Sequence, residues 1–539
     1  MARVVVLARR GMLSPQKLAV AALLAAFVAV CVASLPYLSL TTDEPRHYRY
    51  GRRILDSDAG RFEDSQMPVT ALNAFPAWVG ERLPDGPIAR GLRHFQVGRL
   101  PTILVGILLA YTVYAWGRNL YGPAPGLLAL FLYVMDPNIL AHARLITTDL
   151  FVAAGTVITL YLFWRFARRR SVGRALAAGL ALGLAQVAKY TAIALFPLLI
   201  LLILIYDLPR LIRIARRGRR SNLGRYLGRS AILILLFLAL SLAVIYVAFL
   251  GEYTFLPLQD YAFRSPVLQA VQTALAGADW IRVPVPAPYL KGLDGVMHWE
   301  SSGIGYARFY LLGELRQGER FPGYFLIATV LKTPPGTQVI FLLSLVALAR
   351  TWNWRRFIRG EQFLLVPLLM FSLYFNLLSR AQIGIRYVLL TLPLIHVIAG
   401  RLAQGLPRWP KGRRIALSLG LASIALSTLS YHPDYLAYFN EIVWDRRLAY
   451  RYLADSNLDW GQSDVFLREY LDRHPEARLE PEEITEGEVI VRVNNLVGIT
   501  EDPGRYAMLR EECVPIATVG HAYLLYRMPC GEGKVTEGD

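Results

Sequence analysis

Long apolar runs alternate with short polar segments along most of this 539-residue chain. A membrane-spanning helix needs about 20 predominantly apolar residues, or fewer where it is buried within a bundle. The apolar runs predict about eleven spanning helices, at 18–40, 100–116, 124–135, 150–166, 175–187, 191–206, 230–250, 326–348, 363–378, 387–398 and 415–429. The first run exceeds the ~7–15 apolar residues of a signal peptide, so we interpret it as an uncleaved helix. The pattern predicts an all-α integral membrane domain over residues 1–432.

The pattern changes after residue 432. Residues 465–474 have helical spacing, whereas 488–493 and 523–527 are strand-like. We therefore expect a small α/β domain over residues 433–539. It contains Cys513 and Cys530, which are expected to form a disulfide if the domain faces an oxidising compartment; two unpaired buried thiols are the alternative.

Composition and charge support a membrane protein. The chain is 55% hydrophobic and 18% charged, whereas soluble domains average about 45–50% and about 25%. Residues 433–539 hold 11 basic and 21 acidic residues, so the net charge of +18 arises from the preceding region. Its arginine-rich segments lie at 165–174, 209–229, 350–359 and 401–414.

These basic segments fall on one side of an eleven-span topology. The positive-inside rule makes that side cytoplasmic, together with the N-terminus. Loops 41–99 and 251–323 and the domain 433–539 then lie outside the plasma membrane. Because topology accounts for the basic residues, we expect a lipid bilayer as the partner and no nucleic acid.

Two adjacent carboxylates, Asp43 and Glu44, begin the first outer loop. A carboxylate at a membrane boundary is costly to desolvate, so one of the pair could act as a general base. The alternative is a helix cap, with Asp43 at the N-cap and Pro45 in the first turn. The two interpretations are compatible.

The second outer turn, residues 136–149, contains His142, Arg144 and Asp149. Polar residues at membrane depth are usually functional. Residues 147–149 also fit the start of the next helix, but His142 and Arg144 have no capping role.

Three further cations, Lys189, Lys332 and Arg386, occur at predicted outer helix ends. Each could extend to the interface as an isolated side chain. The positive-inside rule disfavours positive charge on the outer face. A single anion bound by all three cations therefore explains their positions more simply than three separate interfacial side chains. A phosphate held at the membrane surface is such an anion.

The ordered set of motifs resembles a known family. It comprises Asp43-Glu44, residues 136–149, residues 384–387 (Gly-Ile-Arg-Tyr) and residues 457–462 (Asn-Leu-Asp-Trp-Gly-Gln). The set is similar to that of bacterial polyprenyl-phosphate-dependent glycosyltransferases of the GT-C fold. These enzymes are relatives of the dolichyl-phosphate-mannose–protein mannosyltransferases and of the lipid A aminoarabinose transferase. One departure is residues 66–69, Gln-Met-Pro-Val, where many relatives have His-Pro-Pro-Leu.

The resemblance implies inverting transfer of a sugar from a polyprenyl phosphate to an acceptor hydroxyl. The acceptor class, which is protein, lipid or glycan, stays open. Asp43 would be the catalytic base, and Glu44 would position the acceptor or the sugar. The expected donor phosphate and sugar site comprises Arg386, Lys189, Lys332, Arg144, His142 and Asp149. No cofactor is required, although a carboxylate pair could bind a divalent metal.

Two other functions compete with this interpretation. A transporter or flippase of lipid-linked sugars would also need basic residues near a polar midplane, but transporters usually have internal repeats and compact loops. A structural or sensory membrane protein would leave the outer acid–base cluster unexplained.

Overall fold

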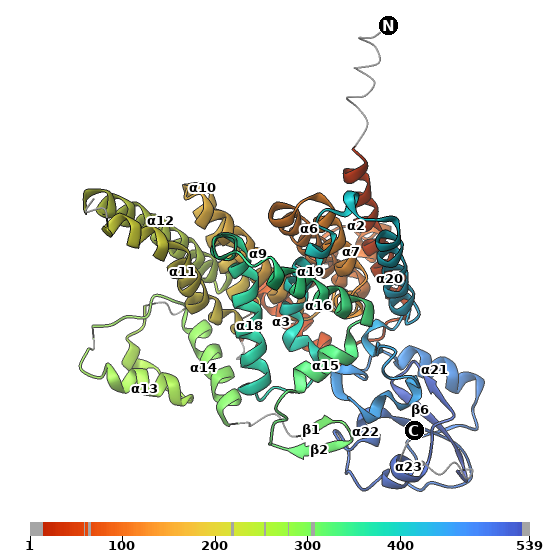
Figure 1. Cartoon of the computed structure of the whole chain (residues 1–539). Helices are drawn as coiled ribbons and strands as arrows, with labels where there is room; N and C mark the ends of the chain where they lie inside the picture. The colour runs from red at the N-terminus through yellow and green to blue at the C-terminus, as the bar shows by residue number, and fades with distance from the viewer. Residues whose placement is uncertain are drawn as a thin grey trace.

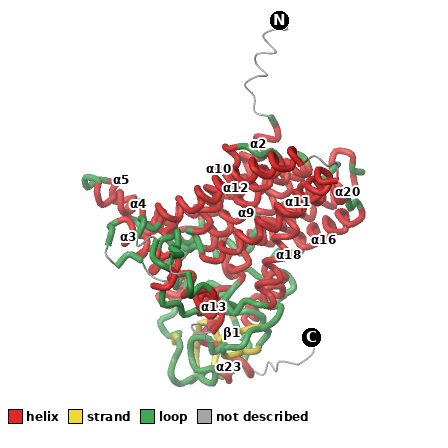
Figure 2. Tube along the Cα trace, turned by 90° about the vertical axis from the view of Figure 1, so that its left-hand side faces the viewer, coloured by secondary structure: helices red, strands yellow, loops and turns green. Residues whose placement is uncertain are grey.

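We describe the protein from a computed structural model that covers residues 14–58, 60–62, 66–216, 220–252, 255–278, 280–302 and 308–530. The predicted cytoplasmic N-terminus and part of the 209–229 loop lie outside these residues. Figure 1 shows a bundle of helices above a smaller domain that contains the C-terminal strands. In the perpendicular view of Figure 2, helices fill the upper part and the strands lie below them.

All eleven predicted apolar runs are helical. The helices that carry them are α2 (Pro15–Ala33), α6 (Leu100–Tyr121), α7 (Pro123–Val134), α9 (Asp149–Arg168), α10 (Val172–Gln186), α11 (Leu195–Arg216), α12 (Arg220–Ala248), α15 (Tyr324–Lys332), α16 (Pro335–Arg350), α18 (Gln362–Leu377), α19 (Leu392–Gly400) and α20 (Lys411–Leu429). By length and composition, seven helical stretches in the described chain suit a membrane span, or eight if a bent pair counts as one. The structure therefore confirms a multi-helix membrane protein, but not eleven spans.

The bent pair consists of α15 and α16, which meet at 115°. Pro334 and Pro335 lie at the break. Proline lacks the N–H needed to continue a helix and disfavours helical geometry in the residue before it. A single apolar run, 326–348, thus forms two helices rather than one straight span.

Close packing inside the bundle depends on small residues. A Cβ added at Gly179 of α10 would lie 2.4 Å from the carbonyl oxygen of Phe237 in α12. Small residues let helices approach closely within a membrane. This contact fixes α10 between α9 and α12.

The remaining helices lie mainly in the long loops 41–99 and 251–323 and in the C-terminal region. They are α3 (Glu44–Leu55), α4 (Ala71–Arg82), α5 (Pro87–Arg93), α8 (Pro137–His142), α13 (Pro266–Ala274), α14 (Ala287–Ser302), α17 (Trp354–Arg356), α21 (Asp464–Arg473), α22 (Val493–Leu496) and α23 (Ala507–Glu512). Short 3₁₀ turns connect them, and the one that matters most below is η7 (Ile385–Thr391).

The C-terminal region forms a four-stranded sheet in the order β3-β4-β6-β5. Its strands are β3 (Arg478–Leu479), β4 (Gly487–Arg492), β5 (Ala517–Val519) and β6 (Tyr523–Met528). β3 pairs in parallel with β4, and the other two pairs are antiparallel. A disulfide joins Cys513 to Cys530, which confirms the predicted pairing.

The C-terminal sheet packs onto the helical bundle. Val489 and Tyr526 of the sheet belong to the same buried apolar cluster as residues of the bundle. A hairpin in the second long loop, β1 (Arg308–Leu311) and β2 (Glu314–Gln317), also joins this region. The backbone N–H of Leu312 donates to the carbonyl of Tyr452 at 2.8 Å. These contacts hold the hairpin and the C-terminal region together at one end of the helical bundle, below it in Figure 1.

Candidate active site

Asp43 occupies the N-cap position of α3, but its side chain makes no capping hydrogen bond. Its Oδ2 instead accepts a hydrogen bond from Nη1 of Arg386 at 2.7 Å. The partner lies 343 residues away on η7. The geometry therefore rejects the capping role for the Asp43 side chain.

Glu44 points away from Asp43 and is fully buried. Both carboxylate oxygens bind the guanidinium of Arg99, at 2.9 and 2.7 Å. They also accept hydrogen bonds from the backbone N–H groups of Thr41 and Ile146, at 3.0 and 2.9 Å. Since its acceptor capacity is used inside the protein, Glu44 holds the first loop to the turn before α9. The expectation that it positions substrate is not supported by this placement.

Arg386 retains hydrogen-bonding capacity beyond Asp43. Its Nε is buried and has no hydrogen-bond partner among the described residues. The guanidinium carbon lies 4.2 Å from the ring centroid of Trp460. Gly384 allows η7 to approach the C-terminal region, because its φ is +140° and an added Cβ would lie 2.2 Å from Oγ of Ser456. The stacked ring and the close backbone fix the direction of Arg386.

Lys189 forms a second ion pair beside the first. Its Nζ lies 2.7 Å from Oδ1 of Asp149, at the start of α9. The same Nζ lies 4.5 Å from the centroid of the Tyr387 ring. The ammonium group of Lys189 has three N–H donors, and the ion pair with Asp149 uses one of them.

These two ion pairs line one cavity of about 710 Å³. Asp43, Asp149, Lys189 and Arg386 all contribute to its wall. α14 also contributes to the lining, with apolar side chains and Glu300. The cavity thus combines the carboxylates of two ion pairs and Glu300 with the cations Lys189, Arg386 and Arg46, next to an apolar part of the wall.

Sequence reasoning missed His47 as a site residue. It lines the cavity four residues after Asp43 on α3, and its Nδ1 is buried without a hydrogen-bond partner among the described residues. Burial lowers the pKa of His47, and the Asp43 carboxylate opposes that shift. The i, i+4 spacing from Asp43 was the available signal, because residues four apart share a helix face.

Residues 66–69, which depart from the family pattern, also reach the cavity. Gln66 and Met67 line its wall and are buried. Oε1 of Gln66 has no hydrogen-bond partner among the described residues. Gln66 and Met67, which differ from the family pattern, therefore lie where they can change which ligands fit in the cavity.

Three predicted site residues do not line this cavity. Arg144 is buried and donates to the carbonyl oxygens of Leu140 and Pro433, at 3.0 and 2.8 Å. Lys332 is also buried and donates to the carbonyls of Leu436 (2.7 Å) and Asn457. Both cations therefore attach the bundle to the region that follows it.

His142 is the third of these residues. Its ring centroid lies 6.0 Å from that of Trp460, the ring that also contacts the Arg386 guanidinium. Burial lowers the pKa of His142 to about 4, so the imidazole is neutral at pH 7. A neutral ring cannot supply the positive charge expected of it, although it can still donate a hydrogen bond.

The motif at residues 457–462, called the clamp below, forms hydrogen bonds to the two segments that carry Asp43 and Arg386. Oδ1 of Asn457 accepts from the N–H of Ile385 at 2.9 Å, which orients η7. The carbonyl of Trp460 accepts from the N–H of Thr42 at 2.9 Å, which orients the residue before Asp43. Together they fix the two segments that bring Asp43 and Arg386 into contact.

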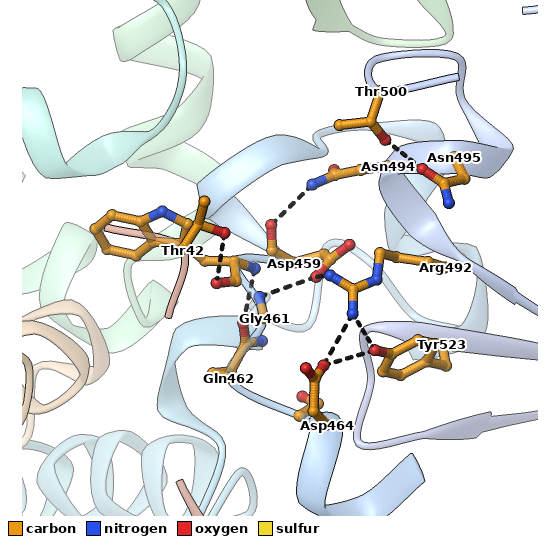
Figure 3. Close-up of polar contacts among 12 residues, drawn as sticks. Thr42, Asp459, Gly461, Gln462, Asp464, Arg492, Asn494, Asn495, Thr500 and Tyr523 are labelled. Carbon is orange, nitrogen blue, oxygen red and sulfur yellow. Dashed lines mark hydrogen bonds and ion pairs between the residues drawn. The ribbon is translucent and has the colours of Figure 1, made fainter. Parts of the chain in front are cut away.

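Figure 3 shows how the clamp joins the sheet. Oδ1 of Asp459 accepts from the N–H of Gly461 at 3.2 Å and lies 3.9 Å from Nη1 of Arg492 in β4. The Asp459 carbonyl accepts from Nδ2 of Asn494 at 3.0 Å. Burial raises the pKa of Asp459 to about 6, against the opposing effect of Arg492. The sheet thus supports the clamp from behind.

A second cavity, of about 600 Å³, lies among α15, α16, α18, η7 and α19. Its lining is predominantly apolar and includes Phe325, Leu365 and Val388. Val388 follows Arg386 and Tyr387 on η7, and those two residues line the first cavity. The turn η7 therefore separates a charged cavity from an apolar one.

Several solved structures are similar to this chain. ArnT from Cupriavidus metallidurans bound to undecaprenyl phosphate is 17% identical, with a TM-score of 0.46 over 78% of this chain and 68% of ArnT. The apo oligosaccharyltransferase of Archaeoglobus fulgidus is 13% identical, with a TM-score of 0.44 over 77% of this chain and 54% of that protein. AglB of the same organism, in complex with an inhibitory peptide and a dolichol-phosphate, is 13% identical, with a TM-score of 0.43 over 75% and 54%.

No curated protein matches this chain in sequence. Residues 91–218, from the end of the loop 41–99 through α11, match the family model described as dolichyl-phosphate-mannose-protein mannosyltransferase. This match confirms the resemblance over about a quarter of the chain. The matched segment contains Asp149 and Lys189, one of the two ion pairs of the cavity.

Proposed function

We propose, from the family match over residues 91–218, that this protein is a GT-C glycosyltransferase. It would transfer a sugar with inversion from a polyprenyl phosphate to an acceptor hydroxyl on the outer membrane face. The observation that carries the proposal is the cavity in which Asp43 contacts Arg386 and Asp149 contacts Lys189. It combines a base with cations at the ends of apolar helices, as this reaction requires.

In this mechanism, Asp43 accepts the proton of the acceptor hydroxyl. The hydroxyl oxygen attacks the anomeric carbon, and the bond from that carbon to the phosphate oxygen breaks. Attack from the face opposite the phosphate inverts the anomeric configuration. A phosphate leaves with its negative charge, so a second, protonating acid is not needed.

Arg386 and Lys189 stabilise the phosphate as its charge develops. The buried Nε of Arg386 has no hydrogen-bond partner among the described residues, so it is available to donate to the phosphate. Asp43 and Asp149 orient the two cations before the donor binds. Since these cations supply positive charge, the proposed reaction requires no metal ion.

The apolar cavity beside η7 suits the polyprenyl chain of the donor. It lies at membrane depth, among helices that expose apolar side chains such as Leu326, Leu342 and Leu369. A lipid whose phosphate reaches Arg386 can extend past Val388 into this cavity. Burial of its methylene groups favours binding by roughly 0.8 kcal/mol each.

The proposal is tested by transfer from synthetic polyprenyl-phosphate sugars to peptide, lipid and glycan acceptors, with purified protein in detergent. We expect one donor–acceptor pair to give product, with unchanged rates in EDTA. Arg386→Ala should weaken both polyprenyl-phosphate binding and turnover, because a phosphate contact serves ground and transition states alike. Arg380→Ala, outside the cavity lining, is the matched control. No product from any pair, or full phosphate-lipid binding by Arg386→Ala, would contradict the proposal.

We propose an eleven-span topology in which the C-terminal domain lies outside the plasma membrane and the arginine-rich loops lie inside. We expect Gly313→Cys, in the exposed turn between β1 and β2, to react with a membrane-impermeant thiol reagent in intact cells. Arg213→Cys, exposed near the end of α11, should react only after the membrane is opened. Labelling of Arg213→Cys in intact cells would overturn this orientation.

A further inference from the structure

Helix α13, in the loop between α12 and α14, packs onto its own loop through Leu268 and Gln272, which are its partly buried side chains. Its glutamine side chains bind backbone carbonyls of the same loop. Nε2 of Gln272 donates to Leu258 and Tyr261, at 2.9 and 2.8 Å, and Nε2 of Gln269 donates to Phe263 at 2.8 Å. In a water-soluble loop, an amphipathic helix turns these positions outward.

The apolar stripe of α13 points outward instead. Val267, Val271 and Leu275 recur at intervals of four residues, and they are 56%, 42% and 36% exposed. No residue of α13 is buried. Residues 265–278 include no charged residue. The segment thus presents an uncharged apolar surface that stays exposed in the part of the chain that the structure describes.

The surrounding loop fixes this reversed orientation. Leu258, Tyr261, Phe263 and Ala287 form a small buried cluster under the helix. The carboxylate of Asp294 in α14 accepts from the N–H of Ser265, directly before α13, at 2.9 Å. The outward direction of Val271 is therefore a property of an ordered unit, not of a mobile tip.

The position of α13 indicates what covers its apolar stripe. In Figure 1 the helix lies at the lower left, level with the lower end of α18, and runs across the view. Leu377 and Leu378, at that end of α18, are 51% and 62% exposed. Trp280, shortly after α13, is 82% exposed. Tryptophan is enriched at membrane–water interfaces, and a helix with one apolar face lies along them.

We infer that α13 lies in the outer membrane interface, with Val267, Val271 and Leu275 against lipid acyl chains and Leu268 and Gln272 against the protein. The loop then attaches to the bilayer beyond the edge of the helical bundle. α14, which follows this loop, lines the 710 Å³ cavity. The lipid contact therefore holds one wall of the cavity from outside. This inference needs only that α11, α12 and α18 cross a membrane, and it does not depend on glycosyl transfer.

The test uses spin labels on single cysteines, Val267→Cys, Val271→Cys and Leu275→Cys, in full-length protein reconstituted into phosphatidylcholine–phosphatidylglycerol vesicles. Cys31 is buried and the other two cysteines form a disulfide. The parent protein, treated with the same spin label, therefore measures background labelling of these native cysteines. Collisions with oxygen, relative to those with a water-soluble nickel chelate, report lipid contact. Thr273→Cys is the matched control, because Thr273 is exposed on the opposite face of α13.

We expect the oxygen-to-nickel collision ratio to be several-fold higher at 267, 271 and 275 than at 273. Equal ratios at all four positions would show that the stripe faces water and would overturn the inference. Labels that are immobile and inaccessible to both reagents would also overturn it, because they indicate a protein partner. Trp280→Phe gives an independent measurement: wild-type fluorescence should be quenched by lipids with brominated acyl chains more than that of the variant.

Discussion

Asp43→Asn is expected to slow sugar transfer about 10²–10⁴-fold, the usual contribution of a general base. Asparagine keeps the size of the side chain and its hydrogen bond to Arg386, but it cannot take a proton from the acceptor. Binding of the polyprenyl-phosphate donor should survive, because Asp43 acts on the acceptor. The measurement is kcat per folded molecule with a synthetic donor, together with the affinity for that donor.

The matched control for this variant is Asp56→Asn at the other end of α3. Asp56 pairs with Arg52 at 3.3 Å on the surface, outside the cavity lining. We expect it to transfer sugar at the wild-type rate. If Asp43 acted only as a helix cap, Asp43→Asn would instead lose about 0.5–2 kcal/mol of stability and keep normal turnover. Near-normal turnover by Asp43→Asn would remove Asp43 as the base and leave Asp149, on the same cavity wall, as the next candidate.

Glu44→Gln is expected to lower the free energy of unfolding by about 3–5 kcal/mol, the cost of breaking a buried ion pair from one side. Glu44 and Arg99 have fully buried side chains, so the substitution leaves the Arg99 charge without its carboxylate. The backbone N–H groups of Thr41 and Ile146 lose part of their acceptor as well. Unfolding in mixed detergent micelles, followed by tryptophan fluorescence, measures the change.

Turnover separates this structural role from a catalytic one. Per folded molecule, Glu44→Gln should transfer sugar at close to the wild-type rate. Glu81→Gln provides the control, since Glu81 pairs with Arg52 on the surface, where an ion pair contributes about 0–1 kcal/mol. A stable Glu44→Gln protein that has lost transfer would instead restore Glu44 to the reaction.

Much of the site could be predicted because its residues carry local signals. Asp43, Lys189 and Arg386 are charged residues next to apolar runs, where charge is costly unless it is used. Glu44 carries the same signal and proved to be a structural residue. A sequence shows that a buried charge needs a partner, but not whether that partner is a substrate or, as here, Arg99.

The sequence by itself determined the apolar helices, the strands β4 and β6 of the C-terminal region and the asymmetry of charge, whereas the break at Pro334 and Pro335 within one apolar run appeared only in the structure. These features follow from the length, periodicity and composition of short segments, which act through local geometry and solvation. Only the tertiary structure decided which side chains meet. Asp43 and Arg386 come together across 343 residues, and α13 turns its valines outward because its glutamines find backbone carbonyls of the same loop. The direction of a side chain depends on packing between distant segments, and no local pattern records that packing.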